Sequence, residues 1–271
     1  MIKIKWKYYW LIPFTEIWFA NKKEINQIYN KKWNLFFYQS EKIENYKESD
    51  LEEKKFNTWI IDLSQEINNI FKNFSQTIRN EIKKIWKILN QENLYWLEEK
   101  KYNLTIENLE KSKKNLINFI SFYNNFAKIK KIPQLKYWIL KKYLNNFDIL
   151  KLTFDSDIII YHIYLNDNQK KISRLMYSCS IPDNNNKKIT WWLNNYFHYK
   201  DLEYYKNLWY KIYDFWGLFL AKPWNDKNLK QQVNITNYKL KFKPEIITQY
   251  HYFKKSKLYD FLKNIYLKIF K

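Results

Sequence analysis

Hydrophobic positions in the first 147 residues form short apolar stretches and then long amphipathic patterns. Residues 1–63 carry short apolar stretches around a charged segment, which predicts two or three strands and one short helix, with the best strand at 60–63. Over 64–90 and 105–131 the apolar residues recur at steps of three and four, the spacing of one helical face. Pro133 opens a further short helix that ends near residue 145.

The hydrophobic period changes to two after residue 147. Residues 148–154, 157–165 and 170–179 read as strands joined by short polar connections, so they predict an antiparallel meander. The elements expected after it are a helix from about 190 to 208, a strand at 210–215, a helix over 231–241, a strand at 245–253 and a final helix from 256. This order predicts an α+β (mixed α/β) fold, with a mixed, mostly antiparallel sheet flanked by helices.

Length and pattern together divide the chain into three expected parts. A chain of 271 residues is long enough for one large domain or two small ones with a real core. We expect a partial N-terminal α/β subdomain at 1–63, a helical segment packed on the sheet at 64–147, and a C-terminal core at 148–271. No repeat or flexible linker interrupts this order.

Tryptophan stands in places where a chain normally uses glycine. The sequence has 13 tryptophans and one glycine, Gly217, although glycine usually makes up about 7% of a protein. In LWYKIYDFWGLFLAKPWNDKN, residues 208–228, tryptophan occupies a helix end, a strand end and a turn, and it resists the positive φ that glycine accepts. These positions favour the hypothesis that the gene uses UGA for glycine and was translated as if UGA encoded tryptophan. The alternative, a genome that reads UGA as tryptophan, explains the excess of tryptophan but not the scarcity of glycine.

The charge of the chain is large and comes almost entirely from lysine. The formal net charge is +21, which is typical of proteins that bind nucleic acid or an anionic surface. Arg79 and Arg174 are the two arginines among the 48 basic residues. Because arginine is favoured for specific phosphate and base recognition, and because abundant Lys, Asn, Ile, Tyr and Phe indicate AT-rich coding, we expect most of this charge to be solvated lysine. A weak attraction to RNA stays open.

The numbers of cysteines and histidines and the lengths of the apolar runs exclude several classes of protein. A single cysteine, Cys179, excludes a disulfide framework and fits a reducing compartment. The three histidines have no spacing typical of a metal site, so we expect no metal. No apolar run approaches the roughly 18 residues of a membrane helix, and Thr15-Glu16 breaks the apolar N-terminal stretch too early for a signal peptide. We therefore expect a cytoplasmic protein.

Aromatic-rich motifs in the C-terminal half carry a family resemblance. With glycine read for tryptophan, residues 193–217 become LNNYFHYKDLEYYKNLGYKIYDFGG. The motif residues are Asn195, Phe197, His198, Tyr199 and Asp201 on a helix, Tyr210, Tyr213, Asp214, Phe215, Trp216 and Gly217 on a strand, and Tyr238, Lys239, Lys241 and Phe242 after it. They resemble the acyltransferase-like proteins of the GNAT superfamily, in particular the branch allied to the Fem-type aminoacyltransferases that build peptidoglycan cross-bridges.

The resemblance covers roughly residues 58–260. Upstream, residues 78–86 look like the family's R-x-x-I-R-K-A helix, and residues 122–132 look like its F-Y-x-x-F-A-x-x-K helix. Lys243-Pro244 replaces the expected Gly-Gly, and lysine stands where the first helix usually has a second arginine. The resemblance implies a GNAT-like core at 148–271, in which two neighbouring parallel strands splay apart and hold an acyl donor through exposed backbone amides.

Three polar residues of these motifs are the candidate catalytic groups. His198 is a candidate proton acceptor or substrate contact, and the alternative is a buried histidine bonded to backbone. Asp201, three residues later on the same helix face, either orients the imidazole or caps the helix. Asp214 lies in an apolar strand, where a carboxylate is costly unless paired, so it serves the site or fixes a loop. Elsewhere, His162 is expected in the core, and Cys179 has no histidine or acid paired with it in sequence.

The candidate substrate-binding residues are mostly cations: Arg174, Tyr213, Lys239, Arg79 and Lys83. Arg174, flanked by apolar residues in a strand, is expected to point into a cleft or to pair with a carboxylate. Arg79 and Lys83 share a helix face and either contact a phosphate or carboxylate or lie in solvent. Tyr213 mainly packs and offers a hydroxyl contact, and Lys239 belongs to the third family motif.

The leading hypothesis is an acyl- or aminoacyltransferase that acylates an amine, with acyl-CoA or aminoacyl-tRNA as co-substrate and no tightly bound cofactor. The resemblance implies cell-envelope (peptidoglycan) biosynthesis, with tRNA as a partner if it carries the acyl group. Aminolysis needs proximity, a path for the amine proton and stabilisation of an oxyanion. Two alternatives stay open: a basic RNA-associated protein of the organellar ribosomal type, and a catalytically silent GNAT-like domain. The first should carry many arginines and a disordered basic tail, which this sequence lacks.

Overall fold

The computed structural model describes residues 2–8, 12–29, 34–42, 52–90, 103–155, 158–180, 187–216 and 227–254. The chain groups into two compact units, Met1–Thr58 with Ile246–Lys271, and Trp59–Glu245. Strand β4 (Glu52–Asp62) contributes to both units, and strand β10 (Glu245–Lys254) returns the chain to the first. The expected division at residues 63 and 147 stays a prediction.

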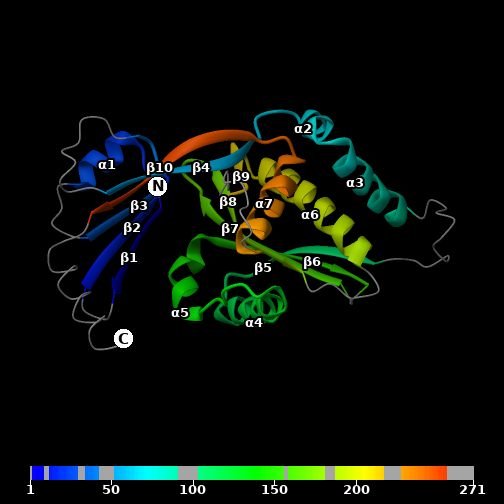
Figure 1. Ribbon diagram of the computed structural model, residues 1–271, viewed down its shortest axis with the longest axis horizontal. Coiled ribbons are helices and arrows are strands. Elements are labelled where there is room, and N and C mark those ends of the chain that lie inside the picture. Colours follow the sequence, from blue (N-terminus) through cyan, green and yellow to red (C-terminus); the bar gives the residue numbers. More distant parts are fainter. Residues whose placement is uncertain are drawn as a thin grey trace. The chain divides into compact units, whose positions relative to one another are not determined.

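In the residues that the structure describes, the first unit contains a small sheet and helix α1 (Figure 1). Strand β1 (Ile2–Tyr8) pairs antiparallel with β2 (Ile12–Trp18), and β2 pairs parallel with β3 (Asn34–Ser40). β10 runs antiparallel to β3 on its other side. With β4, the described part of residues 1–63 therefore contains four strands, one more than the largest number predicted.

Helix α1 (Lys22–Tyr29) begins with a reciprocal capping pair. The Asn21 side chain accepts from the Glu24 N–H at 2.9 Å, and the Glu24 carboxylate accepts from the Asn21 N–H at 2.8 Å, so two free helix donors are satisfied. The helix buries Ile25 and Ile28 against the sheet. The apolar partners in this core are Ile17, Ala20, Leu35, Phe37 and Tyr252.

The second unit contains the predicted meander. Strands β6 (Phe147–Phe154), β7 (Ile158–Asp167) and β8 (Ile172–Ser180) pair antiparallel in chain order, which confirms this prediction. Strand β9 (Ile212–Asp214) lies parallel to β8 and antiparallel to β4. The strand predicted at 210–215 therefore shares a sheet with the meander, in the order β4-β9-β8-β7-β6-β5.

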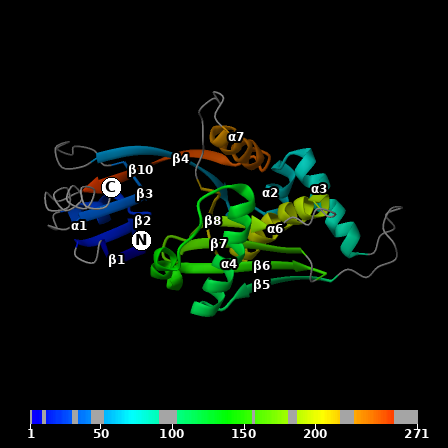
Figure 2. The same ribbon diagram turned by 60° about the horizontal axis from the view of Figure 1, so that its bottom comes forward.

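Helices cover both faces of this meander (Figures 1 and 2). On one face lies α6 (Lys187–Asn207), with α3 (Gln76–Leu89) packed on it, and on the other lies α4 (Lys113–Lys130). Side chains alternate along a strand, so Tyr161 of β7 contacts the α4 rings while its neighbour His162 contacts α6. The remaining helices are α2 (Ile67–Asn73), α5 (Tyr137–Leu140), a 3₁₀ turn (Lys141–Asn146) and α7 (Lys227–Leu240). No helix in the described ranges is long and apolar enough to cross a membrane.

Two helix predictions are corrected by contacts from distant parts of the chain. The helix expected over 64–90 breaks before α3, where the Ser75 N–H donates to the Lys241 carbonyl at 2.7 Å and the Ser75 hydroxyl caps α3. The helix expected from Thr105 is wrong at its start, because Leu104–Leu109 forms strand β5 against β6. Pairing with β6 satisfies the backbone hydrogen-bonding groups of residues 104–109, and the local pattern of hydrophobic positions does not reveal this pairing. The helix expected from 256 lies outside the described residues.

Two tryptophans have the backbone conformation that glycine prefers. Trp209 and Trp216 have φ values of 61° and 60°. Trp209 ends α6: its N–H donates to the Lys206 carbonyl, and the Tyr210 N–H donates to the Tyr205 carbonyl, the paired bonds of a Schellman motif. Its side chain is 82% exposed, so little packing offsets the strain of the left-handed backbone.

The other described tryptophans lie in regular strands and helices. They are Trp6, Trp18, Trp59, Trp86, Trp138, Trp191 and Trp192. Positive φ thus favours glycine at 209 and 216 in particular. The UGA hypothesis stays a prediction, and the codons of the gene decide it.

We expect Trp209→Gly to raise the free energy of unfolding by about 1 kcal/mol, because glycine has no Cβ to clash in the left-handed region. The measurement is the urea unfolding midpoint of purified protein. The matched control is Trp138→Gly, which replaces another exposed tryptophan, 59% accessible, within α5. That control should lower stability because glycine is a poor helix former. A loss of stability in Trp209→Gly would contradict the strain at this helix end.

Candidate functional site

Parallel pairing between β8 and β9 ends abruptly in the middle of β8. The register runs Ile172↔Ile212, Ser173↔Tyr213 and Arg174↔Asp214. β8 then continues to Ser180, whereas β9 ends at Asp214. Among the described residues, β8 has no further pairing on this side, so Arg174 and Asp214 mark the point where the two strands stop pairing.

A buried ion pair occupies this point. Nε and Nη2 of Arg174 donate to Oδ2 of Asp214 at 3.1 and 2.6 Å, and both side chains are about 1% exposed. Oδ1 of Asp214 accepts from the Trp216 N–H at 2.7 Å. Burial lowers the pKa of Arg174 to about 10, although Asp214 opposes the shift. Arg174 thus pairs with a carboxylate, one of its two expected arrangements, and Asp214 also fixes the loop after β9.

Lys239 brings a second cation, which is partly buried, to the same place. It comes from α7, and its Nζ donates to the carbonyls of Phe215 and Trp216 at 2.6 and 2.9 Å. Burial lowers the pKa of Lys239 to about 8; Asp214 works against this shift, and the nearby Arg174 adds to it. An ammonium group therefore lies beside the backbone that follows the last paired residue of β9.

A second polar cluster surrounds Asp201 inside the aromatic core. Nδ1 of His162 lies 2.6 Å from Oδ2 of Asp201, and the Tyr164 hydroxyl donates to the same oxygen. Nδ1 of His198 is 3.9 Å from that oxygen and lies 3.2 Å from the Tyr213 hydroxyl, which is 2.7 Å from the hydroxyl of Tyr164. Asp201 therefore hydrogen-bonds to His162 directly, whereas its link to His198 is a longer 3.9 Å approach beside the hydrogen bonds through the two phenols.

Burial sets the protonation of this cluster. Desolvation first, and then the nearby His162 and Lys239, lower the pKa of His198 well below its ordinary 6.5. Desolvation raises the pKa of Asp201 and raises the pKa of Tyr164 and Tyr213 well above 10. At neutral pH His198 is thus an uncharged imidazole, and the two tyrosines are hydrogen-bonding phenols.

A chain of hydrogen bonds ties α6 to α7 and α3. Nε2 of His162 lies 3.2 Å from Oδ1 of Asn194, whose Nδ2 donates to the Tyr238 hydroxyl at 2.8 Å. That hydroxyl donates to Oδ1 of Asn195, and Asn195 donates to the Glu81 carboxylate. Since Tyr238 precedes Lys239 on α7, the chain holds the lysine's helix against the helix that carries His198.

The His162, His198 and Asp201 side chains also form a possible metal-ligand group, which their spacing in the sequence does not reveal. Their nitrogen and oxygen donors all lie within 4.8 Å of one another. These donors already contact each other or a tyrosine hydroxyl, and the two imidazoles are stacked at 4.3 Å. We interpret the group as a hydrogen-bonded cluster.

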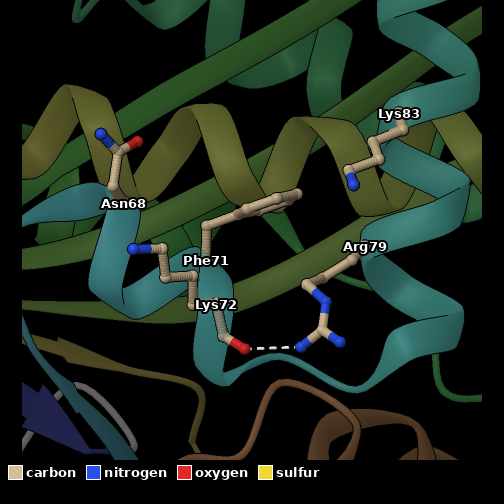
Figure 3. A pocket seen from close by; sticks show the side chains of 5 residues that line it. All are labelled: Asn68, Phe71, Lys72, Arg79 and Lys83. Atoms are coloured by element: carbon tan, nitrogen blue, oxygen red, sulfur yellow. Dashed lines mark hydrogen bonds between the residues drawn. The ribbon is translucent and has the colours of Figure 1, made fainter.

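The other predicted candidates lie apart from these two clusters. Arg79 and Lys83 line a pocket on α2 and α3 (Figure 3). Cys179 is buried beside Tyr161, and burial raises the pKa of its thiol well above 9, which disfavours the thiolate. His162 is buried as expected, but its bond to Asp201 makes it part of the cluster.

Sequence reasoning missed several members of this network. Tyr164 lies two residues after His162 and therefore on the same strand face, a signal that period-two alternation offered. Tyr238 belongs to a family motif, yet its hydroxyl contacts needed the packing of α7 on α6. Glu81 gave no signal, because its partner Asn195 is distant in sequence.

The comparisons with known proteins identify the fold. No family model and no curated protein matches this sequence. Solved structures similar to the chain include the following three. FemX has a TM-score of 0.61 at 8% identity, covering 98% of this chain and 86% of that chain. The C-terminal domain (DUF2156) of a putative lysylphosphatidylglycerol synthetase from Agrobacterium fabrum has a TM-score of 0.55 at 10% identity, covering 90% and 78%.

L-PGS from Bacillus licheniformis has a TM-score of 0.53 at 14% identity, covering 94% of this chain and 81% of that chain. The observed architecture confirms the coarser prediction, a mixed α+β fold with a large, mostly antiparallel sheet flanked by helices, and these neighbours share that fold. Identities this low establish the fold alone.

The depressed pKa of His198 predicts acid sensitivity of the fold. The unfolded chain binds a proton at this histidine below about pH 6.5, whereas the folded state resists it. The free energy of unfolding contributed by His198 is therefore present above that pH and is lost as pH falls below it. In His198→Gln the decline between about pH 7 and 5 should be shallower, as measured by urea unfolding. Parallel curves for parent and variant would show that His198 accepts a proton in the folded state.

Proposed function

We propose that this protein transfers an acyl or aminoacyl group from an activated donor to an amine. The observation that carries the proposal is the end of β8–β9 pairing at Arg174 and Asp214, with the Lys239 ammonium beside it. In GNAT-like folds, an acyl donor lies between two parallel strands that splay apart. The name of one neighbour refers to a putative lysylphosphatidylglycerol synthetase, and this favours an aminoacyl donor and a reaction of the cell envelope.

Lys239 is suited to stabilise the oxyanion of the reaction. The acceptor nitrogen attacks the donor carbonyl carbon, a C–N bond forms, and negative charge develops on the carbonyl oxygen. A cation fixed in a low-dielectric site stabilises such charge strongly because no solvent must reorganise. The carbonyls of Phe215 and Trp216 hold the ammonium in place, and the Arg174–Asp214 pair fixes the loop that supplies the second of them.

His198 is suited to accept the proton that the amine loses. Its depressed pKa keeps the imidazole neutral, and its Nδ1 is engaged with Tyr213. Nε2 has no hydrogen-bond partner within the described part of the chain. The amine proton passes to Nε2, the C–S or C–O bond to the donor breaks as the amide forms, and the leaving thiolate or ribose oxyanion takes that proton back from Nε2.

Transfer should depend on the charge of Lys239. With hydroxylamine as a small acceptor that is already unprotonated, kcat/KM for hydroxamate formation should fall as pH rises through about 8, where Lys239 loses its proton. Lys239→Arg retains its charge to higher pH and should move this fall upward by at least about one unit. A fall at the same pH in both proteins would assign it to another group.

His198→Gln should lower the transfer rate at least about tenfold, equal to roughly 1.4 kcal/mol of barrier, with circular dichroism unchanged. The matched control is His251→Gln, which alters a histidine of the other unit and should transfer like the parent. Asp214→Asn is a poorer test, because it removes the charge that faces the buried Arg174 guanidinium and should cost about 3–5 kcal/mol of stability. Equal rates in His198→Gln and the parent would remove His198 from the mechanism.

A further inference from the structure

Helices α2 and α3 form an open pocket that the proposed transfer chemistry does not use. It has a volume of about 540 Å³ and is lined by Asn68, Phe71, Lys72, Arg79 and Lys83. Three of these residues are cations and none is an acid. This volume falls in the range of small-molecule sites, so the pocket suits an anionic ligand larger than a single inorganic ion.

Arg79 is held in place by the end of α2. Its Nη1 donates to the carbonyls of Lys72 and Phe74 at 2.5 and 2.6 Å. Its Nε and Nη2 have no partner in the part of the chain that the structure describes. One edge of the guanidinium is therefore fixed by backbone, and the other nitrogens remain to bind a phosphate.

Lys83 lies one helical turn beyond Arg79 on the same face of α3. Figure 3 shows Lys83 extending from α3 toward the Phe71 ring and Arg79 extending from α3 to the Lys72 carbonyl, whereas the Lys72 ammonium extends away from Arg79. Arg79 and Lys83 thus supply two positive charges on one wall of the pocket. The chain has only one other arginine, and it is buried against Asp214.

Phe71 forms the apolar part of the pocket. Its ring contacts Phe74, Trp86 and Tyr199 with centroid distances of 6.0, 5.2 and 5.3 Å, which fix its orientation. The residue is only partly buried, and its ring extends between α2 and the two cations (Figure 3). An aromatic ring beside paired cations is the combination that binds a nucleobase together with its phosphate.

We propose that this pocket binds a nucleotide phosphate, with Arg79 and Lys83 contacting the phosphate and Phe71 packing against the base. Two sources carry this chemistry, a single-stranded RNA end and coenzyme A. This inference rests on the proposed function in one respect: acyl transfer from coenzyme A or from tRNA requires a donor that carries a nucleotide. Binding itself is measured without any transfer reaction.

The test is fluorescence anisotropy of a short labelled single-stranded RNA that ends in CCA, with unlabelled coenzyme A as competitor. Lys83→Gln and Arg79→Gln should each weaken binding about fivefold at low salt and make the salt dependence shallower by about one phosphate contact. The matched control is Lys87→Gln, an exposed lysine of α3 outside the pocket lining with the same change in charge. Because Arg79 also supports the end of α2, Lys83→Gln is the decisive variant.

The outcomes of this binding experiment test the pocket proposal independently of the proposed transfer reaction. Pocket-dependent RNA binding that coenzyme A does not displace identifies RNA as the source, and displacement identifies coenzyme A. Either result supports the pocket even if no hydroxamate forms. If Lys83→Gln, Arg79→Gln and Lys87→Gln all bind like the parent, or if all three weaken binding equally, the charge acts diffusely and the pocket proposal is overturned.

Discussion

The buried Arg174–Asp214 pair is the constraint on which the rest of the site depends. A charged pair that is about 1% exposed needs hydrogen bonds on both partners to offset its desolvation. Asp214 uses one oxygen for Arg174 and the other for the Trp216 N–H, so the pair sets the course of the chain immediately after β9. That course places the carbonyls of Phe215 and Trp216 where Lys239 can donate to them, and it anchors α7 to the sheet.

Around this pair, the core combines aromatic packing with polar groups. α6 buries Asn195, His198 and Asp201 among aromatic rings. A helix of that composition is stable only when its polar atoms find partners. β7, β9 and α7 provide them. The same burial keeps His198 neutral and lowers the pKa of Lys239, so a neutral base and a readily deprotonated cation follow from one desolvated environment.

The family motifs point to segments whose polar side chains are buried in the structure, but they do not reveal the partners of those side chains. His198, Asp201 and Asp214 were chosen from sequence, and the structure places all three in buried polar clusters. Of the two arrangements open for Asp201, orienting His198 or capping the helix, neither includes its 2.6 Å bond to Nδ1 of His162, which β7 brings against α6. Helix spacing describes neighbours on one helix, whereas the strand that packs across it is invisible to that rule.

The sequence by itself determined the elements whose periodicity is strong. Apolar and polar residues that alternate with a period of two predict the meander β6–β7–β8 and strand β9, and helical spacing predicts α6. Both patterns are local, because each element buries one face. Only the tertiary structure decided that Leu104–Leu109 is an edge strand, that Ser75 interrupts a helix, and that Lys239 meets the end of β9. Each of these depends on a hydrogen bond between residues far apart in the chain, and no local pattern of hydrophobic positions encodes such a bond.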